Sequence, residues 1–262
     1  MILFILLDGL RPDAITPERT PALWGLQQRG ASTLTARSVM PCITLPCHTS
    51  IFHSVPPERH GITTNTWTPM ARPLPGLFDV AHAAGQRCGF FYNWEPLRNV
   101  SAPGSLAYSL MIDNVNDMTG DQALAAEAAR VLHRERLDFA FVYLGNIDVA
   151  GHNHGWMSDG YLAQVAATDA VVARLLAELP PDTHVLLQAD HGGHDRTHGT
   201  EAPEDMTIPW LLAGPSIRAG HRLAGPVSLL DTAPTLARLL GLSAHPQWEG
   251  RSLDEAFKPR DH

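Results

Sequence analysis

The sequence predicts an α/β fold, a three-layer sandwich in which a central, mostly parallel sheet is flanked by helices. Three observations predict it. Expected strands and helices alternate along the 262 residues, as in βαβ units. The expected strands are uniformly apolar, which is typical of parallel sheets covered on both faces. An aspartate also follows three of these strands, at the sheet edge where ligands of such folds gather.

The first half of the chain begins with a strand over 2–7, a short apolar run that ends at the turn signal Asp8-Gly9. Thr20-Pro21 predicts a helix start, with proline at the first helical position, and Gly30 ends that helix. The next expected elements are helices over 46–54 and 76–84 and a strand over 88–92. Residues 93–118 have little periodicity and many turn-forming residues, so we expect a loop, an edge strand or a small cap there.

The second half begins with a helix over 121–134, which is rich in Ala, Leu and Glu. The later expected elements are strands over 139–144, 184–189 and 210–213 and helices over 161–179 and 229–240. Gly241 ends the last helix. Because no linker, charge run or repeat interrupts the chain, we expect one domain over 1–262, with a small variable cap or loop region around 93–118.

The composition limits the classes of function. The net charge is −8 and no Lys/Arg run occurs, so a nucleic-acid partner is not expected. The apolar start, 1–7, lacks the basic region and cleavage site of a signal peptide. No apolar run reaches the roughly 18 residues that cross a bilayer, so we expect a cytoplasmic protein without a membrane partner. The sequence leaves the oligomeric state open.

Three glycine-containing segments follow expected strands and carry candidate metal ligands: Asp8-Gly9, 146–152 and 189–199, of which the last two combine aspartate with histidine. In the second, Asp148 and His152 are four residues apart, so a helical turn or a tight loop could direct both at one ion. The third contains four candidate ligands, Asp190, His191, His194 and His198. Carboxylate and imidazole together suit Zn²⁺, Mn²⁺ or iron. The pattern therefore predicts a metal site.

These segments resemble the alkaline phosphatase superfamily and, within it, the nucleotide pyrophosphatase/phosphodiesterase branch, in a compact form. The resemblance extends from Leu7-Asp8-Gly9-Leu10-Arg11-Pro12 to Asp231-Thr232-Ala233-Pro234-Thr235-Leu236. Pro41-Cys42-Ile43-Thr44-Leu45-Pro46-Cys47-His48 resembles the motif around that branch's threonine nucleophile. Glu58-Arg59-His60-Gly61-Ile62-Thr63-Thr64-Asn65 resembles the stretch whose asparagine contacts the phosphoryl oxygen. The resemblance implies an alkaline-phosphatase-like fold.

The resemblance also implies two divalent metal ions, Zn²⁺ with Mn²⁺ as the alternative. One ion would be bound by Asp148, His152 and His198, and the other by Asp8, Asp190 and His191, with the Thr44 oxygen bridging or nearby. His194 competes with His198 as a ligand. His198 is preferred because Thr197-His198-Gly199 resembles the family's His-Gly ending.

The implied reaction is hydrolysis of a phosphodiester or pyrophosphate-type bond in a small phosphate ester. Thr44, activated by metal coordination, would attack phosphorus and form a phosphothreonine intermediate. Asn65 would donate its amide to the nonbridging oxygen as charge develops there. Two metal ions roughly 3.5–4 Å apart can stabilise both the attacking and the leaving oxygen.

Other functions of the same fold remain alternatives, namely a phosphomonoesterase, a phosphonate hydrolase or a sulfatase-like enzyme. No arginine lies in the Thr44 segment to offset the extra charge of a monoester, although Arg11 and Arg196 leave the question open. The Cys-x-Pro-x-Arg pattern of sulfatases does not fit Cys42 or Cys47. A non-catalytic metal-binding module is disfavoured, because every expected ligand and the nucleophile are present.

Overall fold

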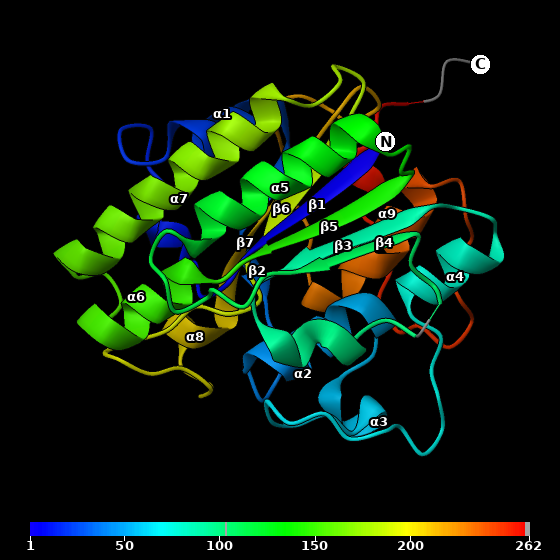
Figure 1. The fold of residues 1–262 in the computed structure, drawn as a ribbon, viewed down its shortest axis with the longest axis horizontal. Coiled ribbons are helices and arrows are strands. Elements are labelled where there is room, and N and C mark those ends of the chain that lie inside the picture. Colours follow the sequence, from blue (N-terminus) through cyan, green and yellow to red (C-terminus); the bar gives the residue numbers. More distant parts are fainter. Residues whose placement is uncertain (103, 260–262) are drawn as a thin grey trace.

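An eight-stranded sheet forms the centre of the computed structural model, which describes residues 1–102 and 104–259 (Figure 1). The strands are β1 (Ile2–Leu7), β2 (Gly30–Arg37), β3 (Cys88–Tyr92), β4 (Tyr108–Met111), β5 (Phe139–Leu144), β6 (His184–Gln188), β7 (Thr207–Ala213) and β8 (His221–Arg222). Their order is β4-β3-β5-β1-β6-β7-β2-β8. Only β7 runs antiparallel to its neighbours, so the sheet is mostly parallel, as predicted.

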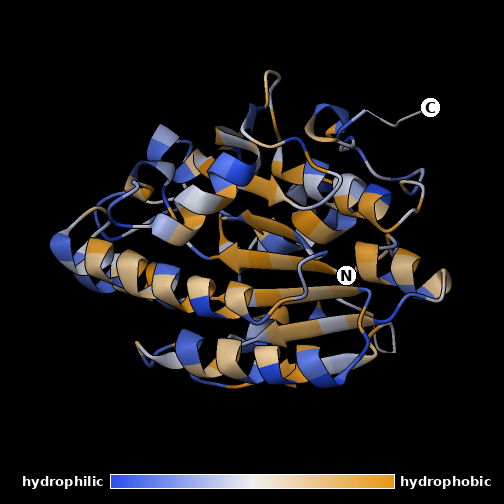
Figure 2. Ribbon diagram, turned by 90° about the horizontal axis from the view of Figure 1, so that it is seen from above, coloured by the Kyte–Doolittle hydropathy of each residue, from blue (hydrophilic) through white to orange (hydrophobic). Residues whose placement is uncertain are grey.

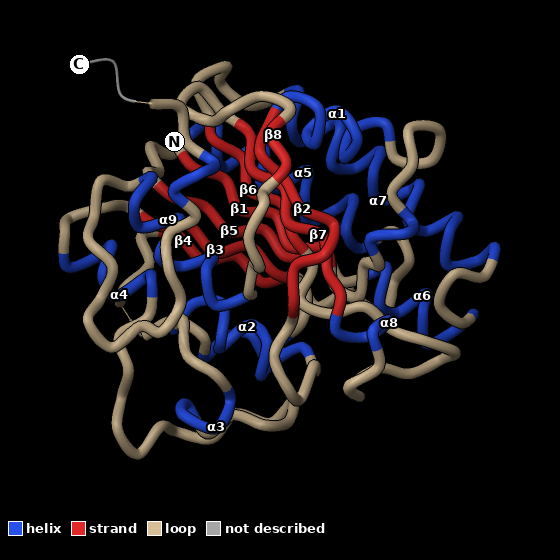
Figure 3. Tube along the Cα trace, turned by 180° about the vertical axis from the view of Figure 1, so that it is seen from behind, coloured by secondary structure: helices blue, strands red, loops and turns tan. Residues whose placement is uncertain are grey.

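Helices cover both faces of this sheet. They are α1 (Pro21–Arg29), α2 (Thr44–His53), α3 (Pro57–His60), α4 (Leu77–Ala83), α5 (Gly120–Arg134), α6 (Asn146–His154), α7 (Asp159–Ala177), α8 (Pro203–Met206) and α9 (Thr232–Leu239). On one face α7 packs between α1 and α5, and on the other α2, α4 and α9 pack together (Figure 1, Figure 3). The predicted three-layer arrangement is therefore confirmed.

The apolar runs predicted as strands form the buried centre of the sheet. Every residue of β1, β3 and β5 is buried, and each of these strands has the predicted bounds. Figure 2 shows the strands of the sheet mostly in hydrophobic colours, between helices that carry both hydrophobic and hydrophilic residues. Buried on both faces, such strands carry continuous apolar runs, which is why the pattern located them.

Strand β2 was not predicted. Its sequence, Gly-Ala-Ser-Thr-Leu-Thr-Ala-Arg, is half polar and shows no sustained apolar run. It is stabilised by antiparallel pairing with β7, which lies about 175 residues later in the chain, as at Thr33 with Trp210. Tertiary pairing therefore forms a strand that the local pattern does not indicate.

An aromatic cluster fixes α2 against the sheet. The ring of Phe52, in the last turn of α2, lies 5.0 Å from that of Phe141 on β5 and 4.8 Å from that of Phe78 on α4. Phe4 on β1 lies 5.1 Å from Phe141, and all four rings are buried. Burying an aromatic side chain contributes roughly 1.5–3 kcal/mol. The cluster thus anchors the helix whose first residue is Thr44.

Two segments near the expected site differ in detail from the prediction. Helix α2 begins at Thr44, two residues earlier than expected, and the segment that begins at Asn146 forms a complete helix, α6. Residues 93–118 contain a 3₁₀ turn (Glu95–Asn99) and the edge strand β4. In the described part of the chain, no helix combines the length and the apolar character needed to cross a membrane.

Candidate metal and phosphoryl site

The predicted site lies at the carboxyl ends of three adjacent strands, β5, β1 and β6. Asp8 directly follows β1, and Asp190 comes two residues after β6. Asp148 lies in the first turn of α6, which follows β5 after one intervening residue. Because these strands are parallel, their carboxyl ends meet at one edge of the sheet, and the three carboxylates converge there.

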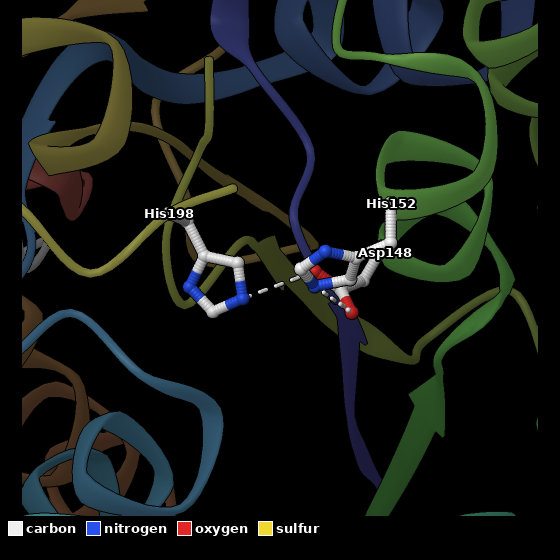
Figure 4. A group of neighbouring side chains, drawn as sticks. All are labelled: Asp148, His152 and His198. Carbon is white, nitrogen blue, oxygen red and sulfur yellow. Dashed lines mark ion pairs between the residues drawn. The ribbon is translucent and has the colours of Figure 1, made fainter. Parts of the chain in front are cut away.

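The first cluster consists of Asp148, His152 and His198 (Figure 4). One ligand atom from each lies within 4.8 Å of the others. The Nε2 atoms of His152 and His198 lie 3.5 and 3.6 Å from the carboxylate oxygens of Asp148. Asp148 and His152 are one helical turn apart, so α6 presents both on the same face. His198 reaches them from the loop that follows β6.

The second cluster consists of Asp8, Asp190 and His191 and is completely buried. His191 Nε2 lies 3.2 Å from Asp8 Oδ1 and 3.4 Å from Asp190 Oδ2. The backbone N–H of Gly9 donates to Asp190 Oδ1 at 3.2 Å and so holds the other oxygen of that carboxylate toward the cluster. Although Asp190 and His191 are adjacent in sequence, both contribute to one cluster.

The three candidate histidines make the same kind of outer hydrogen bond. Each donates its Nδ1–H to a backbone carbonyl: His152 to Arg196 at 3.0 Å, His191 to Gly192 at 2.8 Å and His198 to Cys42 at 3.0 Å. This contact selects the tautomer whose Nε2 carries the lone pair, and in each case Nε2 is the atom that faces the carboxylates. Such outer hydrogen bonds are typical of metal-binding histidines.

The three carboxylates carry like charges that repel one another, and this repulsion changes their pKa values. Burial and the charge of Asp8 raise the pKa of Asp190 to about 8 and raise that of Asp148 well above its usual value. Burial also acts to raise the pKa of Asp8, but the electrostatic interaction with His191, when this ring is protonated, outweighs it and lowers that pKa to about 2. When all three carboxylates are ionised, the two clusters together therefore hold more negative charge than their histidines neutralise.

Unpartnered buried atoms indicate what would neutralise that charge. Asp8 Oδ1, Asp148 Oδ1 and Asp190 Oδ2 are buried without a hydrogen-bond donor. Buried polar atoms are normally paired, and an unpaired carboxylate oxygen is costly. All three atoms point into the two clusters. The donor set, two Asp/His clusters with open carboxylate oxygens, fits two divalent cations.

Thr44, at the start of α2, lies beside the Asp8/Asp190/His191 cluster and lines a cavity with residues of both clusters. Its Oγ1 is 3.4 Å from His191 Nε2, and its side chain is almost fully buried. Asn65 lies in an exposed loop and lines the same cavity as Thr44. Its Oδ1 accepts a hydrogen bond from the backbone N–H of Leu45 at 3.0 Å. Because that contact uses the carbonyl oxygen, the amide NH₂ of Asn65 is available to a ligand.

His194 lies outside both clusters. It interacts through Nδ1 with Asp205 Oδ1 at 2.7 Å, which raises the pKa of His194. Asp205 also accepts hydrogen bonds from the N–H and hydroxyl of Thr200, at 2.9 and 2.8 Å. These contacts of Asp205 with His194 and Thr200 stabilise the loop that carries His198. The structure thus brings His198, and not His194, to Asp148 and His152.

Tyr143 is a site contact that the sequence analysis did not identify. It lies in β5, is buried, and donates its hydroxyl hydrogen bond to Asp8 Oδ2. Its position within an apolar strand gave no signal of this role. A tyrosine one residue before the end of a strand that leads into the site would be the only local hint.

A cavity of about 470 Å³ opens onto Thr44 and onto residues of both clusters. Its walls include Asp8, Thr44, Asn65, Asp148, His152 and His198. Trp94 and Asp113, from the 93–118 segment, also line it. Among the described residues that line the cavity, there is no lysine or arginine.

The sequence is similar to that of a described protein family. The family model described as type I phosphodiesterase / nucleotide pyrophosphatase matches residues 2–85 and 98–204. Among curated proteins, the chain is 29% identical over 157 residues to a phosphopentomutase of Herpetosiphon aurantiacus, covering 56% of this chain and 39% of that one. It is 33% identical over 103 residues to a sulfatase of Formosa agariphila, covering 36% and 20%. The chain thus spans less than half the length of these relatives.

Solved structures share the fold at low sequence identity. Murine ectonucleotide pyrophosphatase / phosphodiesterase 5, in an inactive form with AMP, superposes with a TM-score of 0.82 at 16% identity, covering 98% of this chain and 99% of that one. The phosphonate monoester hydrolase of Agrobacterium radiobacter gives 0.78 at 16% identity, covering 98% and 77%. The fold is therefore alkaline-phosphatase-like, as expected.

Proposed function

The chain belongs to the type I phosphodiesterase / nucleotide pyrophosphatase family, and we propose that it hydrolyses phosphodiester or pyrophosphate-type bonds in a small phosphate ester. One observation carries this proposal: the Thr44 hydroxyl lies 3.4 Å from His191 and lines one cavity together with residues of both Asp/His clusters. A hydroxyl among open carboxylate and imidazole ligands suits metal-dependent attack on phosphorus.

Two divalent cations, Zn²⁺ or alternatively Mn²⁺, would occupy the clusters. Asp148, His152 and His198 would bind one, and Asp8, Asp190 and His191 the other. When bound, such ions polarise phosphoryl oxygens and lower the pKa of a coordinated hydroxyl. Mixed carboxylate and imidazole ligands are borderline donors that suit these metals better than Mg²⁺ or Ca²⁺.

The chain's own residues would then bind the ester and carry out the substitution. The Thr44 oxygen attacks phosphorus as the P–O bond to the leaving alcohol breaks, and the alcohol takes up a proton as it leaves. Water then attacks the phosphothreonine, the Thr44 O–P bond breaks, and the phosphate product and the free Thr44 hydroxyl are released. Helix α2 begins at Thr44, so the positive end of its dipole lies at this residue and favours the negative charge of a phosphoryl group bound there. The Asn65 amide donates to a nonbridging oxygen as charge develops there.

The cavity's charge favours a diester over a monoester. A monoester carries additional negative charge, and no lysine or arginine among the described lining residues would offset it. The acidic side chain of Asp113 on the wall acts in the same direction. The substrate is therefore proposed to be a small diester or pyrophosphate-type compound and not a nucleic acid, in keeping with the net charge of −8.

A panel of four chromogenic esters tests the proposal. The chelated protein is reloaded with Zn²⁺ or Mn²⁺ and assayed on bis-p-nitrophenyl phosphate, p-nitrophenyl phosphate, p-nitrophenyl phenylphosphonate and p-nitrophenyl sulfate. The phosphate diester should give the highest kcat/KM, and the chelated protein should be inactive. A monoester, phosphonate or sulfate preferred about tenfold over the diester would instead support the activities named for the relatives.

A further inference from the structure

Helix α6 carries two of the proposed ligands but has no cap of its own. Its N-cap position is Gly145, which offers no side chain, and the first N–H groups of a helix need partners. The missing acceptor comes from a different helix. Asp121, in the first turn of α5, accepts hydrogen bonds from the backbone N–H of Gly145 at 2.9 Å and of Asn146 at 3.1 Å.

The contact is part of a buried polar network. Asn93 donates its side-chain amide to Asp121 Oδ1 at 3.0 Å, and the Asp121 backbone N–H donates to Asn146 Oδ1 at 2.9 Å. Asn146 in turn donates to the carbonyls of Val115 at 2.7 Å and Asp117 at 2.9 Å. Asp121, Asn93 and Asn146 are 2% exposed or less, so water does not replace these bonds. The network joins β3, α5, α6 and a cavity-lining loop.

We propose that Asp121 is a positioning residue, which holds α6 so that Asp148 and His152 face His198 at metal-binding distance. Asp121 touches none of the three ligands and acts through the backbone of Gly145 and Asn146. A carboxylate at a helix N-terminus both satisfies N–H groups and interacts favourably with the helix dipole.

Tight packing leaves α6 little freedom to compensate for the loss of this cap. A Cβ placed on Gly9, next to the ligand Asp8, would lie only 3.1 Å from Asp148. A shift of the start of α6 would therefore change the distance between the two clusters. Misplacement of catalytic groups by about 1 Å can cost on the order of 100-fold in rate.

The chain contains a matched control. Asp169, on α7, is equally buried and accepts the backbone N–H groups of Ala22 at 3.1 Å and Leu23 at 2.9 Å, at the start of α1. Helix α1 also has no side-chain cap of its own, but it carries none of the predicted site residues. The two aspartates thus make the same kind of contact, and only one supports a ligand-bearing helix.

The inference rests on the proposed function, and its test reads metal affinity in the absence of substrate. Asp121→Ala and Asp169→Ala are compared by Zn²⁺ and Mn²⁺ titration, by kcat on the preferred ester and by urea unfolding. Asp121→Ala should weaken binding of one cation equivalent about tenfold or more and lower kcat at saturating metal. Asp169→Ala should lose a similar amount of stability, with metal affinity and kcat within about twofold of wild type.

Metal affinity and kcat in folded Asp121→Ala that match those of the Asp169→Ala control would overturn the inference. If Asp121→Ala does not fold, Asn93→Ala removes one bond to the same carboxylate and should weaken the same cation about threefold, and no change would overturn the inference. A wild-type protein that binds two cations but hydrolyses no phosphate ester would refute the proposed function alone.

Discussion

The imidazole rings of His191 and His198 lie face to face, with centroids 3.8 Å apart and planes 13° apart. Each ring belongs to a different Asp/His cluster, so the stack joins the clusters directly. The two groups of candidate ligands therefore lie side by side, as the proposed site for two cations requires.

Replacing Thr44, the proposed nucleophile, should remove most of the turnover and leave metal binding intact. Thr44→Ala should lower kcat on a phosphate diester by about 10³-fold or more, because no other hydroxyl occupies its place. Metal content, measured by elemental analysis, should stay at the wild-type level. Thr44→Ser keeps a hydroxyl and should retain part of the activity. Wild-type turnover by the alanine variant would show that the nucleophile is misassigned.

The choice between two histidines can be settled by counting metal. His198→Ala should reduce bound Zn²⁺ from about two equivalents to about one, because it removes one of three ligands around Asp148. His194→Ala should keep both, because His194 interacts with Asp205 instead. Dialysis against limiting Zn²⁺ followed by elemental analysis gives the count. The reverse pattern would exchange the two assignments.

The Tyr143 hydroxyl should increase the affinity of the Asp8 cluster for its cation. In Tyr143→Phe the ring is kept but Asp8 Oδ2 loses its donor, so affinity for one cation should fall about tenfold. Tyr161→Phe is the matched control, because that hydroxyl donates to the carbonyl of Gly9 at 2.9 Å and not to a proposed ligand. Competition with a fluorescent Zn²⁺ chelator measures both affinities. Equal losses in the two variants would contradict the assignment.

His60 should make stability depend on pH below neutrality. Burial lowers its pKa to about 4, and its Nδ1 accepts the N–H of Ile62 at 3.0 Å, so the folded state holds the ring neutral. Since the folded pKa lies below the unfolded value of about 6.5, this stability is complete above pH 6.5 and is lost as the pH falls toward 4. The loss should reach about 3 kcal/mol.

Comparison with His60→Gln isolates this contribution. Urea unfolding of both proteins in chelator, from pH 7.5 to 4.5, gives the difference in free energy of unfolding at each pH. The difference should shrink as the pH falls, because glutamine does not titrate. A constant difference would show that His60 does not change its protonation on unfolding.

Local patterns in the sequence predicted the three-layer fold and a metal site, and the family resemblance divided the site residues between two clusters. Apolar runs located β1, β3 and β5, and the Asp and His residues that follow strands were those that the structure brings together. Their spacing and chemistry were visible because parallel strands place their carboxyl ends at one edge. Their roles as metal ligands stay predictions.

Contacts between distant segments could not be predicted in the same way. Tyr143 reaches Asp8 across 135 positions, and β2 pairs with a strand about 175 residues later. Asp121 looks from the sequence like an ordinary acidic residue in the first turn of a helix. Its bonds to Gly145 and Asn146 depend on how α5 and α6 are placed by the sheet, which no local window contains.

Both clusters draw on residues from far apart in the chain, and this has a consequence for biosynthesis. Asp8 is synthesised long before its cluster partners Asp190 and His191, and Asp148 is synthesised before its partner His198. A ribosome that has released the first 180 residues has produced most of the central sheet but neither complete cluster. Neither proposed metal site can therefore form in the nascent protein before β6 and the loop after it have emerged.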